Sequence, residues 1–351
     1  MVTIKDIAKL SNVSIGTVDR VIHKRGLVSA KAKEKVELAI RQLKYKPNIY
    51  ARQLKLSKRY KFGILMPELH QDAHYWEQAA VGMRIAAEEL ETLKVKIGFF
   101  YFDRYSENSF FEKYSQILKD DFDGFLIAPI LVDNFKELVR QIPENTPYVF
   151  FDSDLPETKR FTFIGQDPFQ SGLLAGRLMK MLIVDDGDIA VVRVLPEDYH
   201  INLRTEGFQS YFSNNEQRNK IIVYNWHENK DLNNMNTLVN KIVTNNINLK
   251  GIFVTNALTY LVASYIKSNH LENKIKIIGY DLVEENVAYL KNSVIDFLIS
   301  QSPITQGYQG ISLLYRKIVL NHEIDDKIMM PIDIVTKENI DFYKYASKDG
   351  I

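Results

Sequence analysis

Polar side chains that could bind a ligand or transfer a proton stand directly after most of the apolar runs between residues 62 and 300. They are Glu68, Asp103, Asp152, Gln166, Asp167, Asn256, Asp281 and Gln301, and Arg204 opens a helical segment after the run that ends at Val194. Tyr75 and Trp76 begin the helical segment after the first run, where their rings could stack on a ligand. Carboxylates, amides, a guanidinium and aromatic faces together suit a small ligand rich in hydroxyl groups. Any one of these polar residues could equally be a helix cap.

Other chemistry is less well supported by the sequence. Paired carboxylates could hydrolyse a glycosidic bond, but the sequence contains neither a phosphate-binding loop that ends in Gly-Lys-Ser/Thr nor a Gly-x-Ser-x-Gly turn. His70 and His74 have a spacing that could hold a metal if they were helical, with Asp72 between them. A third histidine and a helical glutamate base are missing nearby, so we expect a loop that lines a cleft. We therefore predict no enzyme activity, no metal and no cofactor.

The elements that must position these polar residues are strands alternating with helices. Ten apolar runs are candidate strands: 62–66, 95–102, 124–128, 148–151, 161–164, 189–194, 221–224, 251–254, 275–280 and 294–299. Most are separated by segments long enough for a crossover helix, and near-continuous apolar strands of this kind form parallel sheets covered on both faces. Ligands bind beyond the carboxyl ends of such strands. Ten strands over almost 290 residues favour two doubly wound lobes over one.

The first part of the chain has a different pattern. Residues 3–22 read as two short helices around a tight turn, with Ile4, Ile7 and Ala8 on one apolar face and Ile15, Val18, Val21 and Ile22 on a second. Thr3 and Ser14 can cap the two helices, and Asn12 suits a turn position with positive φ. A third helix from Ser29 to about Leu43 would close a small all-α domain through apolar residues at helical spacing, namely Val36, Ala39, Ile40 and Leu43.

The second of these helices would lie in the major groove of DNA with its N-terminal end nearest the base edges. Arg20 could bond guanine or a phosphate, Ile15 could touch a thymine methyl, and Asp19 could accept from cytosine or brace Arg20. The glycine at position 16 costs about 1 kcal/mol relative to alanine in a helix, and close approach to the DNA backbone is one reason for it. The DNA-contact candidates here are Thr3, Ser14, Ile15, Gly16, Thr17, Asp19, Arg20, His23 and Ser29.

Residues 47–60 form a basic segment between the small domain and the strands. Leu54 is an apolar residue that could wedge between base steps in the minor groove and kink the duplex. Arg52 and Lys55 would then lie against phosphates, and Asn48 and Ala51 are further candidate DNA contacts in this segment. A single copy of this short helix has little to pack against, so we expect it to order only on DNA, beside its counterpart in a dimer. A plain linker is the alternative.

Charge divides the chain in the same place. Residues 1–60 hold 15 Lys and Arg against 4 Asp and Glu, a formal charge of +11, whereas residues 61–351 hold 30 against 40, a charge of −10. One end is therefore suited to a polyanion and the other is not. The chain contains no cysteine, so disulfides and thiolate chemistry are excluded. It shows neither a secretory signal at the start nor a long apolar run, and we expect a cytoplasmic protein.

These motifs resemble those of the LacI/GalR family of transcription regulators. The likeness covers the helix-turn-helix region, the hinge residues Pro47, Asn48, Ala51 and Leu54, and the segments FFDSD, FIGQDPFQSG, NLRTEGF, FVTNA, IIGYD and ISQ of the effector domain, which that family shares with periplasmic sugar-binding proteins. The resemblance implies that Asp103, Asp152, Arg204, Asn256, Asp281 and Gln301 contact an effector. Together with Tyr75, Trp76 and Gln166, these are the nine predicted effector contacts. The segment PELHQDAHYW departs from the Asn-Pro-Phe-Phe type that is usual after the first strand.

We therefore predict a multidomain chain: a helix-turn-helix domain (1–46), a hinge helix and linker (47–60), and a two-lobed, type I periplasmic-binding-protein-like α/β domain with parallel sheets. The lobes are predicted as 61–155 plus 296–325 and 156–295 plus 326–351. The expected function is that of a homodimeric, sequence-specific regulator, a repressor, whose affinity for double-stranded operator DNA depends on a monosaccharide or a derivative. The alternatives are an effector that is a nucleobase or a sugar phosphate, and a sugar-binding protein or carbohydrate enzyme whose small domain serves assembly.

Overall fold

The computed structural model describes residues 4–22, 28–43, 58–130, 132–195, 197–214, 219–227 and 233–343, with the backbone alone at 132–134, 214, 233 and 234. The chain divides into two compact units, Met1–Ser57 and Lys58–Ile351, each of which is considered by itself. The predicted DNA contacts Thr3, His23, Asn48, Ala51, Arg52, Leu54 and Lys55, and with them the hinge segment, lie outside the described residues. Within the described ranges, no helix is long and apolar enough to cross a membrane.

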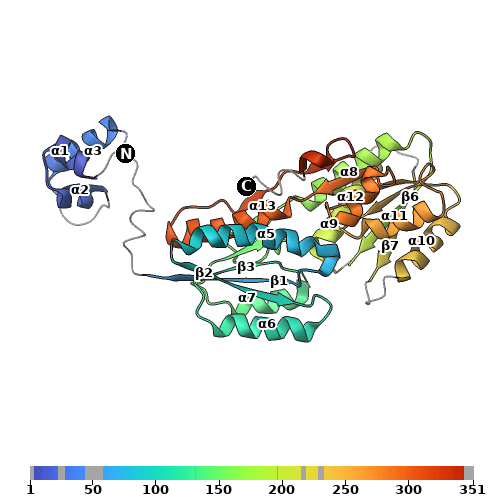
Figure 1. Cartoon of the computed structure of the whole chain (residues 1–351), viewed down its shortest axis with the longest axis horizontal. Coiled ribbons are helices and arrows are strands. Elements are labelled where there is room, and N and C mark those ends of the chain that lie inside the picture. Colours follow the sequence, from blue (N-terminus) through green and yellow to red (C-terminus); the bar gives the residue numbers. More distant parts are fainter. Residues whose placement is uncertain are drawn as a thin grey trace. The chain divides into compact units, whose positions relative to one another are not determined.

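The small unit contains the three expected helices, α1 (Ile4–Ser11), α2 (Ile15–Ile22) and α3 (Ala30–Gln42) (Figure 1). Its core is built from the buried side chains of Ile7, Ala8, Val18, Val36 and Ala39. The turn between α1 and α2 has Asn12 at φ 51°, as predicted from the tolerance of asparagine for this region.

Local hydrogen bonds fix where the helices of the small unit begin. The Ser14 hydroxyl accepts from the amide of Thr17 at 3.1 Å and so caps α2, and Ser29 caps α3 by accepting from the amide of Ala32. The placement of Ile15 on the apolar face is wrong, because its side chain is 50% exposed. Ile15 is the first residue of α2 and is not among the residues that pack in the core of the small unit.

The larger unit contains two six-stranded sheets (Figure 1). In the first sheet the order is β11-β5-β4-β3-β1-β2, and all pairs are parallel. In the second sheet the order is β12-β10-β9-β8-β6-β7, and only β12 pairs in the antiparallel sense. The strands are β1 (Tyr60–Pro67), β2 (Val95–Phe102), β3 (Gly124–Ile127), β4 (Tyr148–Phe151), β5 (Thr162–Gly165), β6 (Asp188–Val194), β7 (Ile221–Trp226), β8 (Leu249–Val254), β9 (Lys276–Tyr280), β10 (Phe297–Ser300), β11 (Lys327–Met329) and β12 (Asp333–Val335).

Helices cover both faces of each sheet. Those of the first lobe are α5 (Gln71–Glu91), α6 (Glu107–Lys119), α7 (Val132–Gln141) and α13 (Pro303–Leu314), which continues as the π-helix Tyr315–Val319. Those of the second lobe are α8 (Pro168–Leu182), α9 (Tyr199–Asn214), α10 (Asn233–Asn245), α11 (Thr259–Ser268) and α12 (Glu284–Lys291). Helices α5 and α13 lie together on one side of the first sheet, and α6 lies on the other side (Figure 1).

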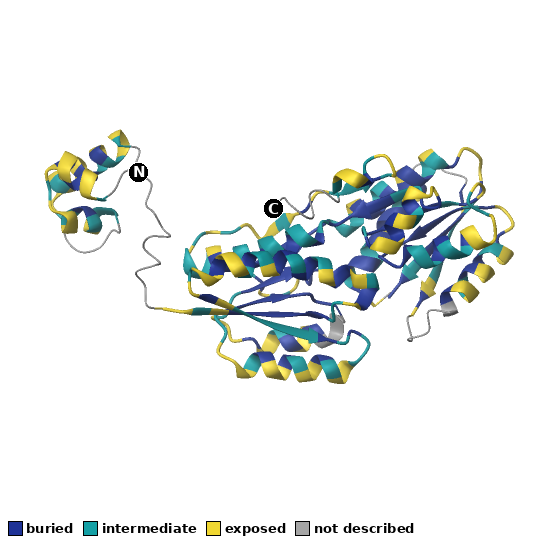
Figure 2. Cartoon of the chain, in the orientation of Figure 1, coloured by how far each residue is buried: buried dark blue, intermediate teal, exposed yellow. Residues whose placement is uncertain are grey.

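Most strand residues are buried (Figure 2), and neighbouring residues of one strand are buried in different cores. In β6, Ile189 and Val191 belong to the core under α8 and α9, whereas Ala190, Val192 and Val194 belong to the core under α10, α11 and α12. Because successive side chains point to opposite faces, a strand that is apolar at every position requires cover on both. The ten predicted strands are all present, and the prediction of parallel sheets is confirmed.

The predicted lobe boundaries are wrong at three strands. Strand β5 belongs to the first sheet, beside β4, although 156–295 was assigned to the second lobe. Strand β10 pairs with β9 in the second sheet, although 296–325 was assigned to the first lobe, and β11 pairs with β5 in the first sheet rather than lying in the second lobe. The sequence of an apolar strand does not indicate which sheet the strand joins, because its pairing partners are distant in the sequence.

The helices α8 and α9 approach each other closely at Gly172. A Cβ added there would lie 2.0 Å from the backbone oxygen of Arg204, which cannot move independently of its helix. Gly172→Ala is therefore expected to lower the free energy of unfolding by at least about 1–3 kcal/mol, the usual cost of overpacking a core. Urea denaturation of the larger unit measures this decrease in the free energy of unfolding. Arg177→Ala on the exposed face of α8 is the control, and equal stabilities of the two variants would contradict the prediction.

Candidate functional site

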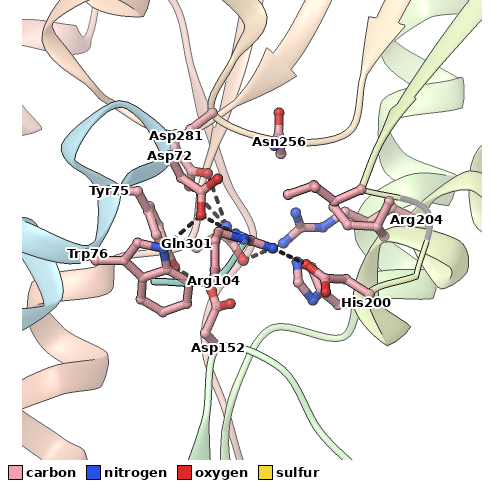
Figure 3. Close-up of a pocket in the computed structure, with 14 residues that line it drawn as sticks. Asp72, Tyr75, Trp76, Arg104, Asp152, His200, Arg204, Asn256, Asp281 and Gln301 are labelled. Carbon is pink, nitrogen blue, oxygen red and sulfur yellow. Dashed lines mark hydrogen bonds and ion pairs between the residues drawn. The ribbon is translucent and has the colours of Figure 1, made fainter. Parts of the chain in front are cut away.

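A cavity of about 20 Å³ lies between the two lobes of the larger unit, and side chains from both lobes line it (Figure 3). Seven of the nine residues that the sequence predicts as effector contacts meet here. They are Tyr75, Trp76, Asp152, Arg204, Asn256, Asp281 and Gln301. The topology explains the meeting, because the carboxyl ends of β4, β6, β8, β9 and β10 all face this region, which is where ligands bind in open parallel sheets.

The carboxylates of Asp152 and Asp281 follow the ends of β4 and β9. Both residues have a left-handed backbone, with φ at 67° and 69°, a conformation that is costly for a residue other than glycine and is retained mainly at functional sites. The Tyr75 hydroxyl donates to Asp152 Oδ1 at 2.5 Å. The amide of Asp152 donates to Gln306 Oε1 at 3.0 Å, which ties this turn to the start of α13.

The guanidinium of Arg204 is connected to Asp281 through one amide. Arg204 Nη2 donates to Gln301 Oε1, and Gln301 Nε2 donates to both carboxylate oxygens of Asp281 at 3.0 and 3.2 Å. Arg204 Nη1 donates to the carbonyl of Thr255 at 2.9 Å, and the guanidinium lies 4.0 Å from the ring centroid of Tyr280. These contacts hold a buried cation in one orientation, and its Nε has no hydrogen-bond partner among the described residues.

Burial shifts the pKa values of three side chains that line the cavity. It raises the pKa of Asp152 to about 6, although Tyr75 and Arg204 oppose the shift. It raises the pKa of Asp281 to about 7 against the opposing effects of Arg204 and Gln301. The neighbouring carboxylate of Asp72 raises both pKa values further. Burial lowers the pKa of His200 well below 6.5, and Arg204 and Arg104 lower it further, so this imidazole is neutral at neutral pH.

These shifts predict the pH dependence of stability. Between pH 3.8 and about 7 the folded protein binds more protons than the unfolded chain, because Asp281 is protonated only when folded. The contribution of Asp281 to the free energy of unfolding is therefore expected to fall as the pH rises through this window, whereas the lowered pKa of His200 contributes with the opposite sign. Thermal unfolding from about pH 5 to about pH 8 measures the total slope. Asp281→Asn removes the first contribution, so the slope of the variant is expected to be less negative than that of the unaltered protein, and identical slopes would contradict the assignment.

Four polar residues of the cavity were missed by the sequence reading: Asp72, Arg104, Asp198 and His200. Arg104 Nη1 donates to Asp72 Oδ2, and Arg104 Nη2 donates to Asp198 Oδ2 at 2.6 Å across the two lobes. Burial alone would lower the pKa of Arg104, but Asp72 and Asp198 outweigh it and raise the pKa. His200 precedes Arg204 by one helical turn of α9, and this spacing was the signal available in the sequence.

Asp72 is placed by an unusual start of α5. Asp72, Ala73 and His74 have left-handed backbones, with φ of 51°, 54° and 64°. The turn directs the Asp72 carboxylate into the cavity, where Trp76 Nε1 donates to it at 2.7 Å. The prediction of a cleft-lining loop is therefore confirmed. His70 and His74 do not share a helical face, because the segment between them is not helical, and their exposed rings lie near Glu68 and Glu77.

Two predicted effector contacts do not occur among the described residues that line the cavity. Asp103 instead accepts from Gln71 Nε2 at 2.7 Å and from the amide of Tyr105 at 3.0 Å, and so fixes the loop that carries Arg104. Gln166 Nε2 donates to the carbonyls of Ser300 at 2.6 Å and Pro331 at 2.7 Å. Gln166 therefore ties together the three segments that cross between the lobes, because each of these residues stands in one of them.

The small unit presents an exposed surface at the start of α2. Ser14, Ile15, Gly16 and Arg20 are exposed, and Thr17 and Asp19 are half-buried. Gly16 has only the Ser14 hydroxyl, at 3.8 Å, near the position that a Cβ would occupy. The fold of the unit therefore does not require a glycine there.

The substitution Gly16→Ala distinguishes a role of this glycine in the fold from a role in contact with DNA. Alanine is expected to leave the stability of the small unit unchanged or to raise it by up to about 1 kcal/mol, while it weakens operator binding by placing a methyl group against DNA. Thermal unfolding and fluorescence anisotropy on an operator duplex measure the two effects. Unchanged DNA affinity would show that the glycine serves no contact with DNA.

Each of the two units matches a known protein family. Residues 62–321 match the model of the periplasmic binding protein domain, and residues 3–48 match the model of bacterial regulatory proteins of the lacI family. A small helix-turn-helix unit followed by a two-lobed ligand-binding unit defines a class of ligand-responsive DNA-binding proteins.

Relatives along the full length narrow the class further. The chain is 26% identical to the ribose operon repressor of Lactococcus lactis, over 97% of this chain and 98% of that protein. It is 26% identical to the transcriptional repressor PurR of Pasteurella multocida, over 97% and 99%. A crystal structure of a protein from Bacteroides fragilis that is assigned as a LacI transcriptional regulator has a TM-score of 0.76 and 28% identity, and covers 82% of this chain and 100% of that one.

The chain belongs to the LacI family of bacterial regulatory proteins. It is a DNA-binding transcription regulator whose operator affinity is controlled by a small polar effector. These relatives do not favour the alternative of a sugar-binding protein or carbohydrate enzyme whose small domain serves assembly.

Proposed function

We propose that the chain is a homodimeric repressor whose effector is a monosaccharide or a closely related polyol, bound in the cavity between the lobes. The observation that carries this proposal is the chain of hydrogen bonds from Arg204 through Gln301 to Asp281, with Asp152 and the rings of Tyr75 and Trp76 beside it. Hydroxyl groups both donate and accept, so they complement a surface that alternates carboxylates with guanidiniums. Relatives named as ribose and sucrose operon repressors support an effector of this class.

The cavity is less suited to the two other effectors considered. A nucleobase needs an aromatic face on which to stack, whereas Trp76 is only 1% exposed and its indole N–H is used by Asp72. A sugar phosphate needs an excess of cationic side chains, whereas carboxylates outnumber guanidiniums among the described residues of the lining. Because PurR is among the relatives, a nucleobase is the second candidate for the effector.

The proposed mechanism is linkage between two sites. Effector bound to both lobes stabilises one orientation of the lobes, with Gln166 and Gln301 in the crossing segments as the pivot. That orientation changes the spacing of the two DNA-binding units in the dimer, and hence their match to the half-sites of a two-fold operator. The change in operator affinity cannot exceed the difference in effector affinity between the two states.

The test combines a ligand screen with a DNA measurement. Monosaccharides are screened for an increase in thermal stability of the full-length protein, and each one that binds is added to a complex with operator DNA. A sugar that stabilises the protein is expected to change operator affinity by about 5- to 150-fold. Specific binding must also weaken steeply with salt. A protein that prefers no duplex over random competitor, or sugar binding that leaves operator affinity unchanged, would refute the proposal.

A further inference from the structure

The lining of the cavity carries more negative than positive charge. Its described residues include the carboxylates of Asp72, Asp152, Asp198 and Asp281 but only the guanidiniums of Arg104 and Arg204. All six side chains belong to residues that are at most 8% exposed. His200, which also lines the cavity, is held neutral by burial beside the two guanidiniums.

The six charged side chains form two clusters, each with one cation and two anions. In the first, Arg104 joins Asp72 of the first lobe to Asp198 of the second. In the second cluster, Arg204 is connected to Asp281 by hydrogen bonds through Gln301, and it lies near Asp152. The second cluster can relieve its excess charge by taking up a proton, since the pKa of Asp281 is raised to about 7. Among the described residues, the first cluster holds one more carboxylate than guanidinium, and its Asp72 Oδ1 makes no hydrogen bond. A buried carboxylate oxygen of this kind is stabilised by a cationic donor.

Specific atoms of the lining also lack partners. Among the described residues, Asp72 Oδ1, His200 Nδ1 and Arg204 Nε are buried and make no hydrogen bond. Buried polar atoms of this kind are rarely left unsatisfied, and three in one cavity point to a ligand. Asp72 Oδ1 requires a donor, and Arg204 Nε requires an acceptor. A ligand that satisfies both must present a donor toward α5 and an oxygen toward α9.

We propose that the effector is a polyol that carries a protonated amine, as an amino sugar does, and that its ammonium group donates to Asp72 Oδ1. The ammonium group would neutralise the cluster of Asp72, Arg104 and Asp198, while a hydroxyl oxygen accepts from Arg204 Nε. This inference rests on the proposed function, because it specifies the chemistry of the same site. A neutral sugar would leave the excess charge in place, and a sugar acid or a sugar phosphate would add to it.

The first experiment measures affinities for matched pairs of ligands on the full-length protein at about pH 6.5, about one unit below the pKa of an amine of this kind, so that the amino sugars are largely charged. Hexoses are compared by calorimetry with the amino sugars in which each hydroxyl in turn is replaced by an amine, and with the uncharged N-acetyl forms. One amino sugar is expected to bind at least about tenfold more tightly than its parent hexose, and acetylation is expected to remove the advantage. A neutral sugar that binds more tightly than every amino sugar, or a panel in which no amino sugar binds, would overturn the inference.

The second experiment removes the charge that the ammonium would meet. Asp72→Asn keeps the shape of the side chain, and asparagine tolerates the left-handed backbone at this position. The preference for the amine over the hydroxyl is expected to fall to about onefold, while Glu144→Gln, an exposed carboxylate outside the cavity, keeps it. An unchanged preference in Asp72→Asn would overturn the inference.

The outcomes separate this inference from the proposed function. Tight binding of a neutral sugar that alters operator affinity would leave the repressor proposal standing and refute the amine. Tight binding of an amino sugar without an effect on operator affinity would refute the repressor proposal and leave the amine standing.

Discussion

Arg204→Ala is expected to weaken effector binding by about 100-fold or more, because it truncates one partner of a buried, hydrogen-bonded charge network. Removing the guanidinium leaves Gln301 without its donor and Asp281 without its nearest cation. It also removes the group that lies 4.0 Å from the ring centroid of Tyr280. Calorimetry with the effector found by the screen measures the loss, and the response of operator binding to that effector is expected to disappear with it.

The same variant is expected to bind operator DNA as the unaltered protein does when no effector is present, because the DNA-binding residues are carried by a separate unit. Arg177→Ala, which removes an exposed arginine from α8, serves as the matched control and should keep the full effector response. Loss of operator binding in Arg204→Ala, at unchanged thermal stability, would contradict a division of the two functions between the units.

Arg20→Ala is expected to weaken specific operator binding by about tenfold to 100-fold, the effect of one bidentate base contact. Arg20 is exposed in the last turn of α2 and is not among the residues that pack in the core of the small unit. Fluorescence anisotropy on operator and on random duplex distinguishes the two possible contacts. A contact with guanine lowers the preference for operator, whereas a contact with phosphate weakens both duplexes and reduces the salt slope by about one.

Arg41→Ala provides the control in the same unit. Arg41 is exposed near the end of α3, and its Nε donates to the carbonyl of Glu37, so its removal deletes one positive charge without touching α2. This variant is expected to lower affinity for all duplexes slightly and equally. Equal losses of specific binding in Arg20→Ala and Arg41→Ala would mean that net charge, and not a base contact, explains the effect of Arg20.

The local elements of this protein were predictable because their signals are local. Apolar periodicity gave the helices of the small unit and the strands β1 to β10, and the capping residues Ser14 and Ser29 lie where they were expected. The strands β11 and β12 were missed, since each has three residues and a run that short has no measurable period. The lobe boundaries failed for another reason, because strand pairing is set by partners far away in the sequence.

The residues of the effector cavity were likewise predictable where the signal was local and unpredictable where it was not. Asp152, Asp281 and Arg204 were found because the end of each strand can be read from the chain, and parallel strands bring their carboxyl ends to one edge. Asp103 was assigned to the cavity by the same rule, but a neighbouring residue, Arg104, reaches it instead. One position along a loop changes the direction of a side chain entirely, and no pattern in the sequence specifies that direction.

The sequence by itself determined the division of this protein into a basic DNA-binding unit and an acidic ligand-binding unit, because charge and apolar periodicity are properties of contiguous residues. Only the tertiary structure decided that Asp72, Arg104 and Asp198 meet between the lobes and that Gln166 ties the crossing segments rather than contacting the cavity. The physical reason is that these contacts join residues far apart in the chain, and their geometry follows from the pairing of strands and the left-handed turn at the start of α5.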